Sequence, residues 1–116
     1  MSEKECLFCK IISGDIPSNK VYEDDSLFAF YDIDPKAPEH ILIVPKKHIS
    51  RIDELEEEDI ELVGKIIFAA KKIAQEKNVK ESSYRLVFNN GVLAGQAVFH
   101  IHLHLLAGRR MHWPPG

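Results

Sequence analysis

Apolar residues recur at intervals of three and four along residues 56–77, the spacing that places side chains on one face of an α-helix. The residues that define this predicted face are Ile60, Val63, Ile67, Ala70 and Ala74. Asp53 is the expected N-cap, and Asn78 can adopt the left-handed conformation that ends a helix. A shorter helix is expected over residues 8–13, ended by Gly14. The pattern therefore predicts one long and one short helix.

Five segments have the length and the β-branched or aromatic composition of strands. They cover residues 20–23, 26–32, 40–45, 83–88 and 98–106. Three strands precede the long helix and two follow it, which favours an α+β domain with a largely antiparallel five-stranded sheet. The long helix is expected to cover one face of this sheet.

The length and composition of the chain exclude several classes of protein. A chain of 116 residues is long enough for one hydrophobic core and too short for two, so residues 1–116 are expected to form a single domain. With 28% charged residues and a net charge of -3, neither a disordered chain nor a nucleic-acid-binding protein is indicated. No apolar run approaches the roughly 20 residues that cross a bilayer, and the N-terminus is too polar for a signal peptide. We therefore expect a cytoplasmic protein with no membrane contact.

The two cysteines are spaced Cys6-Leu7-Phe8-Cys9. Thiols stay reduced in the cytoplasm, so this spacing favours a redox pair or part of a metal site over a disulfide. A metal site would need two further ligands, which histidines could supply.

Three of the six histidines fall within the segment His100-Ile101-His102-Leu103-His104. Side chains alternate along a strand, so the three histidines are expected on one face and the apolar residues between them on the other. Imidazoles can act as nucleophile, proton donor and phosphate-binding group near neutral pH, which indicates phosphoryl or nucleotidyl transfer through a covalent histidine. A catalytic zinc held by the same three histidines is the competing interpretation, although the cysteine pair offers zinc a softer site.

Several segments outside the histidine strand complete a specific pattern. Gly95-Gln96 precedes the strand, and further characteristic segments cover residues 31–38, 40–49 and 108–116. From about Cys6 to its last residue, the chain thereby resembles the histidine triad (HIT) family, in its purine nucleoside phosphoramidase branch. The resemblance implies one HIT domain with a C-terminal tail over about residues 108–116, and a homodimer in which two sheets join into one of ten strands.

The resemblance also implies a reaction, cleavage of the P–N bond of purine nucleoside 5'-phosphoramidates with release of AMP or GMP. His102 corresponds to the nucleophile that becomes nucleotidylated, oriented by the backbone carbonyl of His100. His104 and His40 are similar to the family's phosphate-contacting histidines, and Asp32 to the carboxylate that accepts hydrogen bonds from the ribose hydroxyls. The other residues implied at the nucleotide are Leu7, Phe8, Ile11, Ile16, Phe30, Ile33, Asn89, Gly95, Gln96, Ala97 and, from the tail, Trp113.

Some of these residues have a purely structural alternative. Ile11, Ile16 and Phe30 would be core residues in most proteins of this size. Asp32, in the segment Asp-Ile-Asp-Pro, could simply initiate a turn. Trp113 could belong to a frayed terminus rather than reach the partner subunit's active site.

The family resemblance implies a structural zinc and no catalytic cofactor. Members with a C-x-x-C motif near the start hold the ion with residues that correspond here to Cys6, Cys9, His48 and His100. Four protein ligands make such a site structural, and two buried thiols without metal are the alternative. The chain departs from its relatives at Ala97, where phosphoramidases usually carry a serine that hydrogen-bonds the phosphate. Loss of that donor would weaken transition-state stabilisation by about 1–3 kcal/mol.

Two other functions fit the same residues. One is hydrolysis of dinucleoside polyphosphates through the same histidyl intermediate. The other is a nucleotide-binding module with little catalysis.

Overall fold

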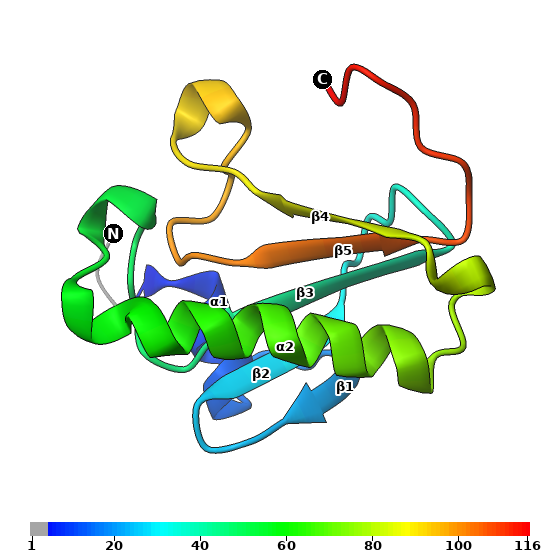
Figure 1. Ribbon diagram of the computed structural model, residues 1–116. Coiled ribbons are helices and arrows are strands. Elements are labelled where there is room, and N and C mark those ends of the chain that lie inside the picture. Colours follow the sequence, from blue (N-terminus) through cyan, green and yellow to red (C-terminus); the bar gives the residue numbers. More distant parts are fainter. Residues whose placement is uncertain (1–4) are drawn as a thin grey trace.

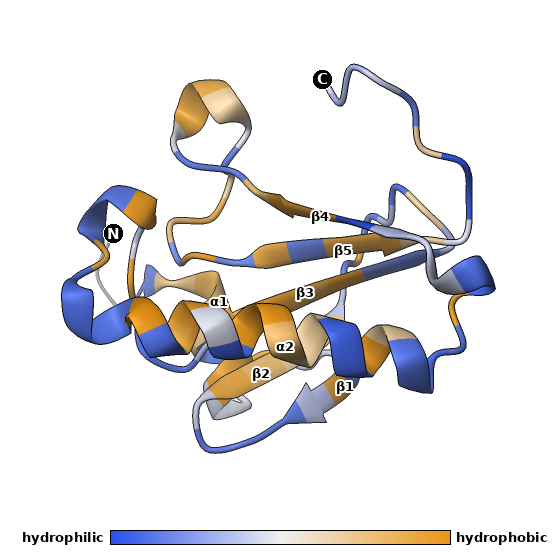
Figure 2. Ribbon diagram, viewed as in Figure 1, coloured by the Kyte–Doolittle hydropathy of each residue, from blue (hydrophilic) through white to orange (hydrophobic). Residues whose placement is uncertain are grey.

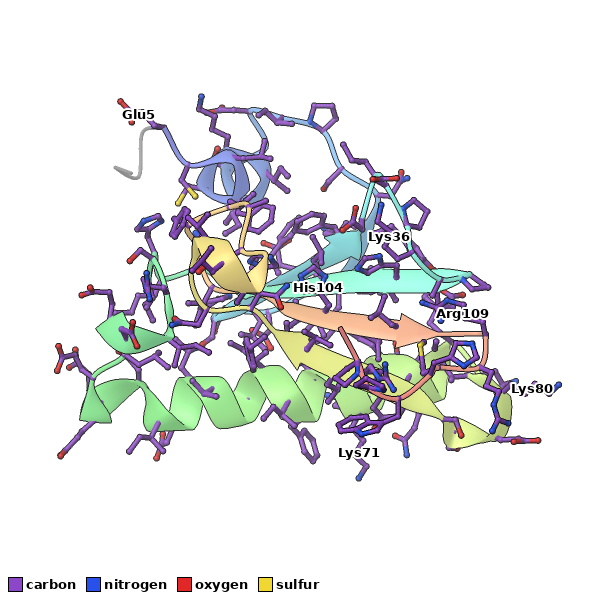
Figure 3. The ribbon with its side chains drawn as sticks, turned by 90° about the horizontal axis from the view of Figure 1, so that it is seen from above. Glu5, Lys36, Lys71, Lys80, His104 and Arg109 are labelled. Carbon is purple, nitrogen blue, oxygen red and sulfur yellow. The ribbon has the colours of Figure 1, made fainter. Side chains whose placement is uncertain are left out.

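The computed structural model describes residues 5–116, which form a five-stranded antiparallel sheet in the order β1-β2-β3-β5-β4 (Figure 1). The strands are β1 (Lys20–Glu23), β2 (Leu27–Tyr31), β3 (Glu39–Pro45), β4 (Tyr84–Phe88) and β5 (Leu103–Ala107). The two α-helices are α1 (Leu7–Ser13) and α2 (Ile60–Glu76). Seen from above in Figure 3, the sheet lies between α1 and α2. The predicted α+β class and the five-stranded sheet are thus confirmed.

The two faces of the sheet support two apolar clusters, because successive residues of each strand point to opposite sides. The α2-side core joins α2 to residues that include Leu27, Ile41 and Ile43. The α1-side core joins α1 to Phe28, Phe30, Leu42 and Val44. Figure 2 accordingly shows β2 and β3 as mostly hydrophobic. Both strands are therefore buried on both faces, and packing from either side holds them in place.

The buried face of α2 agrees only in part with the predicted one, since Ala70 and Ala74 are buried as predicted. Ile60 and Ile67 are exposed at 68% and 47%, so their assignment to the core was wrong. The face that packs on the sheet is Ile66, Ala69, Ala70, Ile73 and Ala74. These residues also have a three-and-four spacing. The helix carries apolar residues around more than one face, so the spacing alone fits more than one choice of buried face. The sheet accommodates the stripe of small residues, which lets the helix approach closely.

The ends of the helices agree with the sequence at two of the three predicted positions. Gly14 and Asn78 both adopt positive φ, at 88° and 57°, directly after α1 and close after α2 as predicted. The prediction of Asp53 as an N-cap was wrong, because a 3₁₀ turn at Glu57–Asp59 precedes α2. There the Glu56 backbone N–H donates to the Asp59 carboxylate at 2.9 Å. Within residues 5–116, no helix has both the length and the apolar composition needed to span a bilayer.

Candidate functional site

The histidine segment enters the sheet later than the sequence predicted. Ladder pairing in β5 begins at Leu103, so the prediction of a strand over residues 98–106 was wrong at its start. His100 and His102 lie just before the strand, where the Ile101 backbone N–H donates to the carbonyl of Ile49 at 2.8 Å. The chain is thus held by a loop rather than by a neighbouring strand. The first two histidines are therefore free of the regular ladder.

The alternation of side chains nevertheless holds through this segment. The apolar members pack in the α2-side core and are Ile101, Leu103 and Leu105. His100 and His102 both make edge contacts with the ring of Phe8 in α1. His104 pairs in the ladder with Leu42, which belongs to the α1-side core. The prediction of one apolar face and one histidine face is confirmed.

The ring of His102 is fixed in one orientation by the backbone. Its Nδ1 lies 2.8 Å from the carbonyl oxygen of His100, an acceptor that requires the proton on Nδ1. The neutral ring then carries its lone pair on Nε2. Burial lowers the pKa of His102, opposed by the hydrogen bond to His100 and by the charge of Asp32. The arrangement favours an unprotonated Nε2 at neutral pH, which is the state a nucleophile needs.

His40 and His104 form a hydrogen-bonded chain whose direction follows from one backbone group. The N–H of Lys36 donates to His40 Nδ1 at 3.0 Å, so a neutral His40 carries its proton on Nε2. His40 Nε2 lies 2.9 Å from His104 Nδ1 and donates to it. A neutral His104 then has its proton on Nε2, available to an acceptor outside the chain. Figure 3 shows His104 over the central part of the sheet and Lys36 at the turn between β2 and β3.

Burial keeps both of these rings neutral. It is the main cause that lowers the pKa of His40 and that, with the charges of His102 and His40, lowers the pKa of His104 to about 4. An unfolded chain would bind these protons near the ordinary value of 6.5. Between pH 6.5 and pH 4 the unfolded state therefore binds more protons than the folded state.

We expect the free energy of unfolding to fall as the pH is lowered from 6.5 to 4, because in that window these histidines take up protons when the chain unfolds. Urea unfolding at intervals across this range measures the slope. His104→Gln should flatten it, because the variant has one buried imidazole fewer. Carboxylates such as Asp24, with pKa values below the ordinary 3.8, lose their contribution only at lower pH. Equal slopes in the two proteins would contradict the assignment.

Asp32 forms the predicted turn and also lies beside His40. One of its oxygens accepts the backbone N–H of Asp34 at 2.8 Å, which is the predicted turn. The other lies 3.6 Å from His40 Nε2. The Asp32 backbone N–H also donates to the carbonyl of His40 at 2.9 Å. The turn therefore holds the carboxylate beside the histidine chain, with one oxygen left for a further donor.

The loop before the histidines is shaped by Gln96. This side chain is buried, and its oxygen accepts the N–H of Gly91 at 2.8 Å. Its amide nitrogen donates to the carbonyls of Ser50 and Val98 at 2.8 and 3.1 Å. All of its hydrogen-bonding groups are thus engaged within the protein. Gln96 therefore holds the loop in place through its side chain.

The other predicted loop residues lie around this clasp. Gly95 has a φ of 96°, which an L side chain rarely adopts, and Asn89 is half-buried beside it. Ala97 is exposed. The loop therefore presents backbone and small groups next to the histidine segment, as an anion site requires.

The predicted apolar residues divide into two groups. Phe8, Ile11 and Phe30 are buried in the α1-side core, so the structural alternative holds for the bulk of these side chains. Ile16 is partly buried against the same core. Leu7 and Ile33 are exposed, Ile33 at 98%. Exposed apolar side chains next to Asp32 and α1 are available to contact a flat apolar group.

The C-terminal tail is attached to the edge of the sheet. The Arg85 guanidinium in β4 donates to the carbonyl of His112 at 2.9 Å. Arg109 donates through Nε to the carbonyl of Lys36 at 2.9 Å. Trp113 is exposed beyond these ties. The tail is thus anchored up to the residue that precedes Trp113.

The four residues with the resemblance to zinc ligands converge on one point, and we call them the Cys/His cluster. They are Cys6, Cys9, His48 and His100, whose ligand atoms all lie within 4.8 Å of one another. Cys9 Sγ lies 3.3 Å from His48 Nδ1, and Cys6 Sγ lies 3.4 Å from His100 Nδ1. The two Nδ1 atoms are 3.2 Å apart.

The donor set fits a soft divalent cation. His100 Nε2 lies 2.7 Å from the carbonyl oxygen of Pro45, which places the ring proton on Nε2 and the lone pair on the Nδ1 that faces the cysteines. Metal-binding histidines are typically oriented in this way by a backbone carbonyl. Burial also lowers the pKa of His100 to about 4, so the ring is neutral as a ligand must be. Two thiols and two imidazoles are the Cys₂His₂ set that tetrahedral zinc prefers.

A catalytic zinc on the three strand histidines is not favoured by this geometry. His100 turns its ring toward the cysteines, while His102 engages its Nδ1 with a carbonyl. Among residues 5–116, these three side chains do not bring their ligand atoms together as one group. That alternative interpretation was therefore wrong, because the segment before β5 directs neighbouring histidines to different places.

Sequence reasoning missed the backbone groups that orient these rings. These groups are the N–H of Lys36 and the carbonyl of Pro45. Almost every residue has such backbone groups, so no residue type in the sequence marks the two that orient the rings. The contact of Phe8 with His102 was also missed, at 4.9 Å between ring centroids and an interplanar angle of 87°.

Residues 13–111 match the family model described as the HIT domain. The chain belongs to the HIT family. A crystal structure of a HIT family hydrolase from Legionella pneumophila Philadelphia 1 is 54% identical, with a TM-score of 0.94 over 97% of this chain and 100% of that chain. The predicted family is confirmed.

Two curated relatives match almost the whole chain, and the second places it in the HINT-like branch of the HIT family. The "14 kDa zinc-binding protein" of Zea mays is 45% identical over 100% of this chain and 91% of its own length. "Adenylylsulfatase HINT1" of Arabidopsis thaliana is 43% identical over 99% of this chain and 79% of its own length.

Proposed function

We propose that this HIT protein hydrolyses purine nucleoside 5'-phosphoramidates through a nucleotidyl intermediate on His102. The observation that carries the proposal is the 2.8 Å contact of His102 Nδ1 with the His100 carbonyl. It leaves the Nε2 lone pair as the reactive position on a ring held between the backbone and Phe8. The HIT family hydrolase from Legionella pneumophila supports a hydrolytic reaction.

The proposed reaction has two steps. His102 Nε2 attacks the α-phosphorus, a bond forms between phosphorus and that nitrogen, and the bond to the leaving nitrogen breaks. The leaving nitrogen takes up a proton and departs as the amine; His104, whose Nε2–H His40 leaves available, is placed to bind a phosphoryl oxygen and assist this transfer. Water then cleaves the bond to His102, releasing AMP or GMP and restoring the ring. These groups come from the chain, so the reaction needs no catalytic cofactor.

The nucleotide is proposed to lie between α1 and the loop before β5. The free oxygen of Asp32 accepts hydrogen bonds from the ribose hydroxyls, since a carboxylate offers acceptors only. Leu7 and Ile33 supply apolar surface to the purine, backed by Phe8, Ile11, Ile16 and Phe30. Gly95 and Ala97 line the phosphate, with Asn89 beside them and Gln96 as the support of the loop.

The Cys/His cluster is proposed as a structural zinc site. The zinc-binding relative from Zea mays supports this, as does the orientation of His100. The ion would supply a cross-link between α1, the loop after β3 and the segment before β5, and no catalytic chemistry.

A homodimer is the proposed assembly. Strand β4 is at the edge of the sheet, so its outer backbone groups have no strand partner within residues 5–116. A second copy added there in the same way would satisfy both edges and give ten strands. Trp113 would then extend from the anchored tail toward the partner. Native mass spectrometry tests this assembly.

Residues 1–116 are proposed to be one HIT domain, with its tail at residues 108–116. The protein is proposed to lie in the cytoplasm.

The decisive experiment is intact-protein mass spectrometry after rapid quenching with adenosine 5'-phosphoramidate. An added adenylyl group that maps to His102 is the expected result. No adduct together with steady turnover would contradict the covalent mechanism.

Comparative turnover tests the leaving group. The name of the Arabidopsis relative favours adenylyl sulfate as a second substrate, cleaved by the same histidine with a different leaving group. Adenosine 5'-phosphoramidate, adenylyl sulfate and diadenosine tetraphosphate should be compared by kcat/KM. We expect the phosphoramidate to have the highest value.

Ala97→Ser should raise turnover of the phosphoramidate by about fivefold to tenfold, because a hydroxyl hydrogen bond to the phosphate is worth on the order of 1 kcal/mol or more. The side chain is exposed, so the added oxygen meets no packing barrier. Ala94→Ser, three residues earlier in the same loop, is the matched control and should leave kcat unchanged. Equal turnover in the parent and Ala97→Ser would show that another donor already serves this oxygen.

A further inference from the structure

His100 connects the Cys/His cluster to the proposed nucleophile, His102. His100 directs its ring to the cysteines, with Nδ1 3.4 Å from Cys6 Sγ, and its carbonyl to His102 Nδ1 at 2.8 Å. Because β5 begins only at Leu103, no ladder hydrogen bond holds the peptide that carries this carbonyl. The position of the carbonyl therefore depends on the contacts of the His100 ring and on the hydrogen bond of Ile101 to its loop.

A second path runs through α1. The helix has seven residues, which is too short to be stable without tertiary contacts. Both of its cysteines belong to the Cys/His cluster, Cys6 as the N-cap and Cys9 within the first turn. Between them, Phe8 packs its ring against His102 at 4.9 Å. The cluster thus holds the helix that supports one side of the His102 ring.

Resting on the function proposed above, we propose that the Cys/His cluster is a positioning device for the nucleophile as well as a structural tie. Its four members are positioning residues. They act on His102 through the His100 carbonyl and through Phe8. When the cluster holds a metal ion, both supports are fixed together, and when it is empty both are released together.

The physical reason is the convergence of ligand atoms in a buried place. Two sulfurs and two Nδ1 atoms lie within 4.8 Å of one another, so one cation could bind all four. Without a cation the four atoms are held together by weak thiol–imidazole hydrogen bonds. Cys6 and His100 are fully buried, so water cannot easily replace the ion. Loss of metal is therefore expected to move α1 and residue 100 before it disturbs the α2-side core on the other face of the sheet.

The test compares the zinc-loaded full chain with the same chain after stepwise chelation, under reducing conditions. The first readout is the tautomer of His102, observed by ¹⁵N NMR at pH 8, which does not depend on turnover. The second is kcat and KM for adenosine 5'-phosphoramidate. We expect a single Nδ1–H tautomer with zinc. Without zinc we expect mixed tautomers and a kcat at least tenfold lower.

Variants separate positioning from general stability. Cys9→Ser should reproduce the chelated state, and Cys9→His, which restores a ligand, should recover the single tautomer and most of kcat. Ile66→Ala removes a buried side chain under α2, on the opposite face of the sheet, and provides the matched loss of stability. It should keep both the tautomer and kcat. Chelation of the parent protein covers the case in which Cys9→Ser does not fold.

Two results would overturn the inference. One is a zinc-free chain that keeps a single tautomer and a kcat within twofold while its unfolding temperature falls. The other is a chain that binds no zinc at saturating concentration. A zinc-loaded chain with an ordered His102 and no turnover would instead reject the proposed function, and the NMR result would still decide the positioning role.

Discussion

Replacing His102 by alanine should lower turnover of adenosine 5'-phosphoramidate by at least about 10³-fold while the affinity for AMP changes by less than about threefold. The ring supplies the attacking nitrogen and no proposed contact to the ribose or the base. The carbonyl that it leaves behind is a backbone group that water can reach through the vacated space. Stopped-flow or single-turnover kinetics measure the turnover, and titration calorimetry with AMP measures the affinity.

His112→Ala is the matched control for the His102 substitution. It deletes the same imidazole from the exposed tail, where only its backbone carbonyl is used by Arg85. Turnover should be unchanged in this variant. Turnover retained in His102→Ala would place the nucleophile elsewhere, and a large loss of AMP affinity would show that the ring binds the phosphate in the ground state.

The histidine face shows what the sequence could predict of this site and why. Alternation is a property of extended backbone and needs no ladder, so it placed His102 and Leu103 on opposite faces even though the strand begins late. The start of the strand could not be predicted, because it depends on which carbonyl the Ile101 N–H reaches. That partner, Ile49, is distant in the chain.

The rotation of α2 is a second case where tertiary packing decides. Ile67 and Ile66 are adjacent, and both belong to three-and-four patterns of apolar residues. Only Ile66 is buried, while Ala70 and Ala74 belong to both patterns and are buried in either case. The observed face is therefore rotated from the predicted one by only part of the roughly 100° between adjacent residues, and the sequence alone does not select between the two.

Gln96 and Asp32 show the same limit for the site itself. The family resemblance brought both residues to the nucleotide, but their hydrogen bonds are set by nearby backbone groups. All the groups of Gln96 are used by the loop, whereas Asp32 keeps one oxygen beside His40. Residue type names the possible donors and acceptors, and only the fold shows which are already taken.

Cys6→Ala should destabilise the protein by two separable amounts, because the Cys6 sulfur has two roles. It lies 3.4 Å from His100 Nδ1 as a member of the Cys/His cluster, and it accepts the N–H of Cys9 at 3.4 Å as the N-cap of α1. Loss of the cap should cost about 0.5–1 kcal/mol, at the low end for caps because sulfur is a weak acceptor. Loss of a tightly held ion should cost about 4 kcal/mol at a free zinc concentration near a thousand times its Kd.

Urea unfolding of both proteins with zinc and with chelator separates these amounts, in the presence of reductant. The parent should lose the larger amount on chelation, and Cys6→Ala should respond little to either condition. Cys9→Ala is the matched control, since it removes the same sulfur atom from the cluster but keeps the N–H that is capped. In chelator it should therefore be more stable than Cys6→Ala by the cap and by the packing of the fully buried Cys6 sulfur. Equal stability of the two variants would show that the Cys6 cap does not stabilise the protein. A parent protein that zinc does not stabilise would show that the cluster does not hold a structural zinc.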